Sequence, residues 1–480
     1  MAMALGLPQL ARAQGQQGSG SPYSAHGFGD LLGTGQVTLA GLGGLSVTVA
    51  DPYSVARANP ATYPRLAHTV YEMGATTRWV SMTLGESTSQ GRATRILGFS
   101  LGVPFGRGKW GMALGLQPYT SVAYQMDDRV ATSEGTIRYQ YSGTGGLNRA
   151  FVGIGRVLWN RSDTTGRAAL LNAGANFEFL FGTVEASRKA FYPSGTGHYN
   201  SSVNSSLVLR APTGTLGLMH AADLISPARA KARLAKRQAG VLQKDKRLEM
   251  EWLNAGKDSA DRKPLRLPKR KADGWRWRAG LGLDLPLEFM ARHSQLATTF
   301  RLNGTIETTI DTASIIESAA GTLTVPVGIA AGFGVQNPRW SIGLEWHQRD
   351  WGSARTDIMG YALRSEMRAA SAYILGASYR PAGDAGGSLL RRTIYRAGVR
   401  YAEDPIVVRS QGITQLGMSF GLSVPIAGTT TRSRINLAVE HGQRGTDAEG
   451  LLSERYTSLH FGITITPDLR EPWFRKKRIE

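Results

Sequence analysis

The alternation of large apolar residues with small or polar ones constrains the fold of this chain more than any other feature. It begins near residue 68 and recurs to residue 466. In one example, Trp340, Ile342 and Leu344 share a face, whereas Ser341 and Gly343 fall on the opposite face. Because successive side chains of a β-strand point to opposite sides, a period of two predicts strands with one apolar face.

Fourteen segments carry this pattern. They cover residues 68–85, 93–105, 110–126, 147–159, 168–187, 199–220, 274–300, 322–336, 338–351, 366–380, 391–402, 411–426, 431–443 and 455–466. Single-chain barrels of bacterial outer membranes have an even number of antiparallel strands, and a strand needs about 9–11 residues to cross the bilayer. Many of the segments exceed that length, which indicates strands that project beyond the bilayer.

The connections between these segments alternate in length. Short connections, such as 106–109 and 336–338, take turns with long polar ones, such as 127–146 and 301–321. Outer-membrane barrels have short periplasmic turns and longer outer loops. The alternative folds, a β-sandwich or a propeller, do not require connections of alternating length. The pattern therefore predicts an all-β, transmembrane antiparallel barrel over residues 67–466, monomeric and in contact with outer-membrane lipid.

Composition fits this fold and limits the chemistry. The 480 residues are 41% hydrophobic and include 59 glycines, no cysteine and eight histidines. Without cysteine there is no disulfide, thiolate zinc site or cysteine nucleophile. The formal charge of +20 is accompanied by no nucleic-acid recognition motif, so no nucleic-acid partner is expected.

One short motif resembles a catalytic one. Residues 98–102 read Gly-Phe-Ser-Leu-Gly, which matches the nucleophile elbow G-x-S-x-G. That elbow requires a sharp turn from a strand to a helix, whereas Ser100 lies inside an alternating segment. With no metal-ligand motif and no phosphate-binding loop, the sequence predicts no enzyme, no metal site and no cofactor.

The two ends of the chain stand apart from the alternating region. Residues 1–13 contain a short apolar stretch followed by Ala11-Arg12-Ala13, which predicts the remnant of a secretory signal peptide. Residues 14–66 are punctuated by Gly and Pro, which predicts either a disordered leader or an irregular hatch or plug inside the lumen, where irregular backbone is tolerated. Residues 467–480 form a basic C-terminal tail.

A basic insertion interrupts the barrel at 223–273. It contains fifteen Lys and Arg residues but only seven Asp and Glu residues. Leu234, Val241 and Leu248 recur at helical spacing, and the basic stretch 263–271 follows. The insertion is therefore expected to be partly helical and periplasmic. It is either a solvated insertion without a partner or a docking element for an acidic surface, such as a periplasmic or secretion-system protein, peptidoglycan or lipid headgroups.

The N-terminal motifs carry a family resemblance. In order, they are Ser21-Pro22-Tyr23-Ser24, then Gly41, Gly43 and Gly44, then Asp51, Pro52 and Tyr53, then Asn59, Pro60 and Ala61. This succession before a barrel resembles the long-chain fatty acid transporter (FadL) superfamily, above all its Bacteroidetes-type relatives, whose chains end in a way similar to 473–478. The resemblance implies a fourteen-strand barrel that the N-terminal hatch closes. The residues that it places at the hatch or gate are Gly41, Gly43, Gly44, Asp51, Pro52, Tyr53, Asn59, Pro60 and Ala61.

The resemblance also implies a function. In that family the Asn-Pro-Ala segment lies beside a kink in the third strand, where the wall opens sideways; here Pro118 stands in the middle of 110–126. Proline cannot donate to a strand ladder, so a local break is expected there. The leading prediction is passive uptake of small hydrophobic molecules, gated by the hatch, with lateral exit at Pro118. The alternative is a non-transport barrel partner or plug of an outer-membrane protein secretion complex, which the basic insertion favours.

Alternation further assigns polar residues to the lumen, where they are expected to pair with one another or with the hatch. The residues are Glu72, Arg78, Asn172, Asn176, Glu178, Glu345, His347, Arg396, Arg400, Glu440 and His460.

Overall fold

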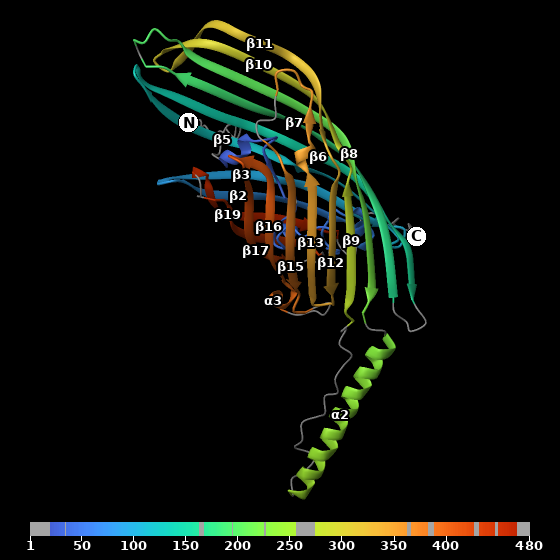
Figure 1. Ribbon diagram of the computed structural model, residues 1–480. Helices are drawn as coiled ribbons and strands as arrows, with labels where there is room; N and C mark the ends of the chain where they lie inside the picture. The colour runs from blue at the N-terminus through green and yellow to red at the C-terminus, as the bar shows by residue number, and fades with distance from the viewer. Residues whose placement is uncertain are drawn as a thin grey trace, which may run out of the picture.

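The computed structural model describes residues 20–33, 35–162, 168–193, 195–224, 227–255, 274–361, 366–382, 388–426, 432–446 and 450–467. The predicted signal peptide (1–13), the basic stretch 263–271 and all but the first residue of the tail 467–480 lie outside these ranges. Within them, one antiparallel sheet closes on itself, because the last strand pairs with the first strand of the barrel wall (Figure 1).

The barrel strands overlap the segments that alternation predicted, and several extend beyond them. Their bounds are β2 (Val70–Leu84), β3 (Ser87–Phe105), β4 (Trp110–Pro118), β5 (Thr120–Thr132), β6 (Gly135–Ser162), β7 (Ala168–Phe191), β8 (Asn200–Asp223), β9 (Arg276–Asp284), β10 (Leu287–Asn303), β11 (Ile306–Val325), β12 (Gly328–Gln336), β13 (Trp340–Asp350), β15 (Ala369–Tyr379), β16 (Ile394–Val408), β17 (Gln411–Pro425), β18 (Arg434–Gly445) and β19 (Ser453–Ile465).

The remaining elements are short, with one exception. They are η1 (Pro22–Ala25), β1 (Asp30–Leu31), α1 (Val37–Ala40), η2 (Pro60–Arg65), η4 (Trp351–Ser353), β14 (Arg355–Thr356), α3 (Leu389–Arg392) and the 28-residue helix α2 (Pro227–Asn254). Nowhere in the described ranges is there a helix long and apolar enough to span a membrane.

The wall of the closed barrel is fourteen strands around, as the sequence predicted. Each of these fourteen positions in the wall is here called a stave, whether one strand or two strands in line occupy it. Three staves consist of two strands in line: β4 with β5, β9 with β10, and β11 with β12. Each break contains a proline at or beside it, namely Pro118, Pro286 and Pro326. Proline removes a ladder hydrogen bond, which is why the strand is interrupted at these points.

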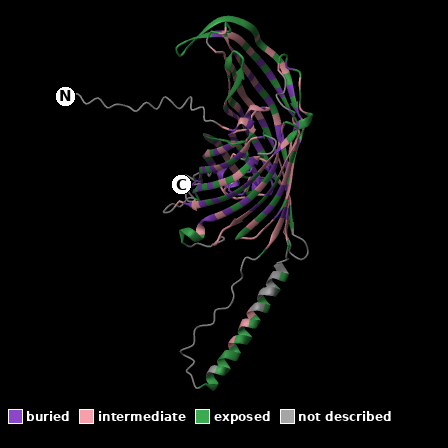
Figure 2. Cartoon of the chain, turned by 60° about the vertical axis from the view of Figure 1, so that its left-hand side comes forward, coloured by how far each residue is buried: buried purple, intermediate pink, exposed green. Residues whose placement is uncertain are grey.

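The two faces of the wall differ as alternation requires. Large apolar side chains point outward; Phe177 and Leu344 are 59% and 57% exposed. Their neighbours Glu178 and Glu345 are almost fully buried. Figure 2 shows this alternation as stripes along the strands. Such a continuous apolar exterior around a polar interior is what a barrel in lipid requires. None of the eleven residues predicted to face the lumen is exposed.

Two of the predicted long loops are wrong: 127–146 and 301–321 are largely strand. β5 and β6 pair from Val122 to Thr132 across a two-residue turn, and β10 pairs with β11 up to Asn303. The alternation simply continues through these polar residues. Together with the facing parts of β7 and β8, they form a curved sheet beyond the barrel, here called the canopy (Figure 1, top).

Helix α2 marks the opposite end, here called the α2 end (Figure 1, bottom). The helix lies within the insertion 223–273, and its described side chains are mostly exposed (Figure 2). The strands on either side stay in register: Asp223 pairs with Arg276, and the Leu224 N–H donates to the Trp275 carbonyl at 2.8 Å. The insertion therefore replaces one tight turn without disturbing the wall.

Candidate functional site

The candidate site is the lumen, where the N-terminal segment (residues 20–66) packs against inward-facing side chains. Small residues on the inward face of the strands leave space for this segment. A Cβ added at Gly174 would lie 2.5 Å from the Pro60 carbonyl carbon, and one at Gly217 would lie 2.3 Å from Asn59 Oδ1. The wall glycines thus allow the backbone of the segment to approach the strands closely.

Asn59 is fully buried and joins the segment to the wall. Its Nδ2 donates to the carbonyls of Val47 (2.8 Å) and Leu218 (3.1 Å), and its Oδ1 accepts from the Ala61 N–H at 3.1 Å. Asn172 of β7 donates in turn to the Ala61 carbonyl at 3.0 Å. The Asn-Pro-Ala motif therefore caps η2 and satisfies its polar groups against β7 and β8.

The glycine-rich turn packs against neighbouring staves. A Cβ added at Gly41 would meet Gly421 of β17 at 3.0 Å, and one on Gly398 of β16 would meet the Leu42 backbone at 2.2 Å. Gly43 and Gly44 have φ of +72° and +96°, the left-handed region that favours glycine. This turn needs glycine both for its conformation and for its contact with the wall.

Glu345 of β13 holds the next stretch of the segment. Its carboxylate accepts the backbone N–H groups of Ser46 (2.8 Å), Val47 (2.8 Å) and Thr48 (2.6 Å). His347 Nε2 lies 3.0 Å from the same carboxylate. Charge-assisted hydrogen bonds of this kind are about twice as strong as neutral ones, so Glu345 is a firm anchor for a backbone that forms no strand.

Asp51, the first residue of the predicted Asp-Pro-Tyr motif, is bound at the α2 end of the lumen. It accepts from Arg396 Nη2 at 3.0 Å and from the Tyr53 N–H at 3.0 Å. The guanidinium of Arg434 lies over the Tyr53 ring, 5.0 Å from its centroid. The motif is therefore tied to β16 and β18.

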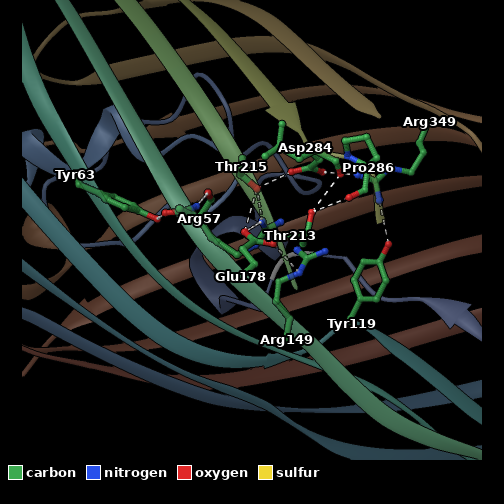
Figure 3. Close-up of polar contacts among 12 residues, drawn as sticks. Arg57, Tyr63, Tyr119, Arg149, Glu178, Thr213, Thr215, Asp284, Pro286 and Arg349 are labelled. Atoms are coloured by element: carbon green, nitrogen blue, oxygen red, sulfur yellow. Dashed lines mark hydrogen bonds and ion pairs between the residues drawn. The ribbon is translucent and has the colours of Figure 1, made fainter. Parts of the chain in front are cut away.

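A larger polar network lies midway along the segment (Figure 3). Arg57 donates to Glu178 at 2.6 Å, and Arg149 lies 3.2 Å from the same carboxylate. Thr215 donates to Glu178 at 3.0 Å and contacts Asp284 at 2.8 Å. Figure 3 shows these side chains converging from the segment and from β6, β7, β8 and β9. One carboxylate thus joins two arginines that are distant in the sequence.

The beginning of the segment is fixed by a second charged cluster. Arg444 of β18 contacts Asp30 at 2.8 Å and Asp404 at 2.6 Å. Ser21 donates to Glu454, which is fully buried. The N-terminal segment is therefore held by ionic or charge-assisted contacts at several places along its length.

Pro118 is the last residue of β4, and the paired ladders part beside it. The β3–β4 ladder ends at Phe99 and Leu116, and among the described residues β5 pairs with β6 and the short β1 instead of β3. Gly98, opposite this point, has φ of +85°. The wall is thus rearranged at Pro118; a lateral path there stays a prediction.

Motifs of other classes prove structural or absent. Ser100 lies inside β3, is 1% exposed and lies 3.3 Å from Gln36 Nε2, so the G-x-S-x-G match forms no nucleophile elbow. Across the described ranges, no group of three or more His, Asp or Glu side chains is placed to hold a metal ion.

Two cavities adjoin the N-terminal segment. One, on the canopy side, has a volume of about 10 Å³ and is lined by Ser24 and Tyr361 among others. Room for one water requires about that volume. The other, of about 420 Å³, opens at the α2 end and is lined by Leu42, Leu45 and six arginines.

Comparison with known families identifies the chain. The family model BamG matches residues 2–262 and 269–480, nearly the whole length. The chain belongs to the BamG family. No curated protein matches it.

Solved structures support the fold of this BamG-family chain. The toluene transporter TbuX of Ralstonia pickettii has a TM-score of 0.53 at 13% identity, covering 91% of this chain and 99% of that one. A Pseudomonas aeruginosa FadL homologue (TM-score 0.48, 11% identity, 91% and 99% covered) and the Pseudomonas putida toluene transporter TodX (0.47, 14%, 90% and 98%) are also similar. The barrel fold that the FadL-type resemblance implied is thus shared with the toluene transporter TbuX.

Sequence reasoning missed several residues of this BamG-family lumen. Arg57 and Asp30 lie in a segment without periodicity, so nothing marked them as partners of the wall. Arg149, Arg444 and Asp284 do lie on inward-facing positions of alternating strands, and extending the alternation to every charged strand residue would have found them.

Proposed function

We propose that this protein is an outer-membrane barrel whose lumen is sealed, and that it serves as a partner or plug in an outer-membrane protein assembly. The observation that carries the proposal is the anchoring of the N-terminal segment by buried charged contacts, of which Arg57–Glu178, Asp51–Arg396 and Arg444–Asp30 are ion pairs of 2.6, 3.0 and 2.8 Å. A partner barrel needs a stable wall and exposed surfaces, and it needs no continuous pore.

The energetics of these pairs favour the closed state. Removing one partner of a buried ion pair costs about 3–5 kcal/mol, because the other charge stays buried without compensation. Withdrawal of the segment would separate three such pairs together and would strip Glu345 of its three backbone donors. A small apolar solute brings no charge that could replace these partners, so it offers little differential affinity for an open state.

The canopy offers a surface suited to an assembly. In the described residues, β5 from Gln125 to Thr132 pairs on one edge with β6, and β11 pairs on one edge with β10 over Ile306–Ile316. Free strand edges expose unpaired N–H and C=O groups and are recognised by added strands. The exposed helix α2 provides a second surface at the other end of the barrel. A partner on the canopy side would bind the strand edges, and a partner at the other end would bind helix α2.

We further infer that the barrel lies in the outer membrane as a monomer, with the α2 end in the periplasm. The apolar exterior supports contact with lipid, and the turns 106–109 and 337–339 at the α2 end are of the short periplasmic kind. The canopy then projects from the cell surface.

Permeability of the purified barrel tests the sealed lumen. Reconstituted in planar bilayers, the wild-type chain should show no stable conductance. Gly174→Ala should open it, because the new Cβ would meet the Pro60 carbonyl carbon at 2.5 Å and displace η2. Gly240→Ala, with open space around the helix position, is the matched control and should stay closed. A wild-type barrel that conducts stably, at the level of Gly174→Ala, would contradict a sealed lumen.

Assembly is tested separately by cross-linking in the native outer membrane. The full chain should cross-link reproducibly to one other outer-membrane or periplasmic protein through the canopy or α2. A chain that cross-links to none, yet raises the uptake of a hydrophobic solute, would overturn the proposal in favour of transport.

The second candidate is passive uptake of small hydrophobic molecules, with the N-terminal segment as gate. It is favoured by the parting of β3 and β5 at Pro118 and by the fold shared with TbuX. In this scheme the solute binds among the canopy strands, passes the gate formed by residues 41–61 and leaves sideways near Pro118 into the bilayer.

A strand-forming residue in place of Pro118 tests that route. Pro118→Val should let the β3 ladder extend toward β5 and should slow the uptake of a radiolabelled aromatic hydrocarbon by cells that depend on the barrel. Pro326→Val, at a break between β11 and β12, is the matched control. Equal uptake by wild type and Pro118→Val would exclude lateral exit there.

A further inference from the structure

We propose that the 420 Å³ cavity at the α2 end is a binding site for a multiply charged oxyanion, that is, a compact group bearing phosphates or carboxylates. The cavity lies between residues 42–52 of the N-terminal segment and the ends of six neighbouring strands, β8, β9, β12, β13, β15 and β16. Neither sealing of the lumen nor uptake of an apolar solute requires such a site.

The charges that line the cavity are strongly unbalanced. Among the described residues, six arginines and two aspartates line the cavity: Arg65, Arg276, Arg278, Arg339, Arg380 and Arg396 against Asp51 and Asp223. Both carboxylates are already engaged, since Asp51 contacts Arg396 at 3.0 Å and Asp223 contacts Arg276 at 2.9 Å. Like charges confined in one concave site raise its free energy unless an anion enters.

Arg278 of β9 lacks an acceptor for one of its N–H donors within the part of the chain that the structure describes. Its side chain is 3% exposed, and its Nη2 donates to Ser341 Oγ at 2.7 Å. Its Nε is buried and has no hydrogen-bond partner among the described residues. A buried donor of a charged group without an acceptor is costly. An oxyanion in the cavity would supply that acceptor.

The cavity wall is also fixed in advance. Asn337 Oδ1 accepts the backbone N–H groups of Arg339 (2.8 Å) and Trp340 (2.7 Å), which holds the turn between β12 and β13. The Arg380 N–H donates to the Arg339 carbonyl at 2.7 Å, so these two arginines sit on adjoining backbones. A rigid wall lowers the entropy lost on binding, and the planar guanidinium fork matches phosphate and carboxylate oxygens.

The volume limits the ligand. Small-molecule sites occupy about 300–1,000 Å³, so 420 Å³ holds a compact molecule or headgroup and no folded domain. Occupancy would join the segment near Asp51 to the ends of β9 and β13. A ligand that binds only the folded, closed barrel stabilises that state by linkage.

Calorimetric titration of the full chain in a neutral detergent tests the site, with pyrophosphate and citrate as probes. We expect one site per barrel, weakened by salt as screening requires. Arg278→Gln should weaken binding about tenfold or more, since a hydrogen bond to a charged group is lost. Arg129→Gln, which removes one charge from the exposed canopy, is the matched control and should bind as wild type does.

Two further measurements keep the test decisive. Arg278→Lys, which keeps the charge but loses the planar fork, should bind with intermediate affinity and covers the case in which Arg278→Gln does not fold. In nanodiscs, loss of pyrophosphate binding when phosphatidylglycerol replaces phosphatidylcholine would identify a lipid headgroup as the source of the oxyanion. Unchanged binding would identify a soluble anion. No binding of either probe, or equal weakening by Arg129→Gln, would overturn the proposal.

Discussion

At the scale of single residues, the wall and the N-terminal segment depend on a few side chains that serve several partners at once. Glu178 is the clearest case, since it accepts from Arg57 and Thr215 and lies 3.2 Å from Arg149 Nε while almost fully buried. Glu345 does the same for three backbone N–H groups. Polar groups in such networks are satisfied only together, so removing one leaves the others buried without a partner.

Replacing Glu178 should therefore destabilise the barrel strongly. Glu178→Gln removes the carboxylate that both Arg57 and Arg149 contact, and we expect a loss of about 3–5 kcal/mol in the free energy of unfolding. Urea titration followed by the gel shift between folded and unfolded barrel measures it.

The control is an ion pair of similar length on the surface. Lys189 and Glu307 are 2.6 Å apart, with 26% and 41% of their side chains exposed. Glu307→Gln should cost about 1 kcal/mol or less, because exposed pairs contribute little. Equal effects of the two substitutions would show that the Glu178 network does not hold the segment.

At the scale of elements, the pairing of the barrel strands does not depend on the insertion that contains α2. The strands that flank α2 remain paired to their ends, where Asp223 meets Arg276 and Leu224 donates to Trp275. Helix α2 is mostly exposed in its described part and takes no share in the wall. Its role, if it binds a partner, is then independent of barrel assembly.

A two-residue turn should replace the whole insertion. Substituting Asn-Gly for residues 225–274 places a favoured hairpin turn directly between Leu224 and Trp275. We expect an unchanged folded band that shifts on heating, and an unfolding midpoint close to that of the wild type. Loss of the folded band would show that α2 is required for assembly of the wall.

At the scale of the whole molecule, the N-terminal segment acts as the missing core of the barrel. The lumen is charged, and the segment supplies Asp30, Asp51 and Arg57 as partners for the wall. An empty lumen would leave those wall charges to water or to each other. The barrel and the segment should therefore fold as one cooperative unit.

Removing residues 20–66 tests that unit. The truncated barrel should unfold at a markedly lower urea concentration than the wild type, since Glu178, Arg396 and Arg444 lose the partners that the segment supplies. Addition of the separate 20–66 peptide should restore part of the stability. A truncated barrel as stable as the full chain would show that the segment is a passive filling.

Much of the fold could be predicted from the sequence because strand alternation is a local property. Each strand carries its own period of two, which assigns side chains to lipid or lumen and makes the number of staves countable. The same rule placed Glu178, Glu345 and Arg396 in the lumen. It failed at 127–146 and 301–321, where a polar strand in the canopy alternates too weakly to be distinguished from a loop.

Only the tertiary structure decided how the lumen is filled and charged. Arg57 meets Glu178 across 121 residues and Asp51 meets Arg396 across 345, distances in sequence that no spacing rule can connect. The six arginines at the α2 end come together because neighbouring strands end at one rim, to which η2 brings Arg65. Local patterning thus determined the wall, whereas closure of the wall determined the contents of the lumen, because contacts across a closed barrel exist only after every strand has paired.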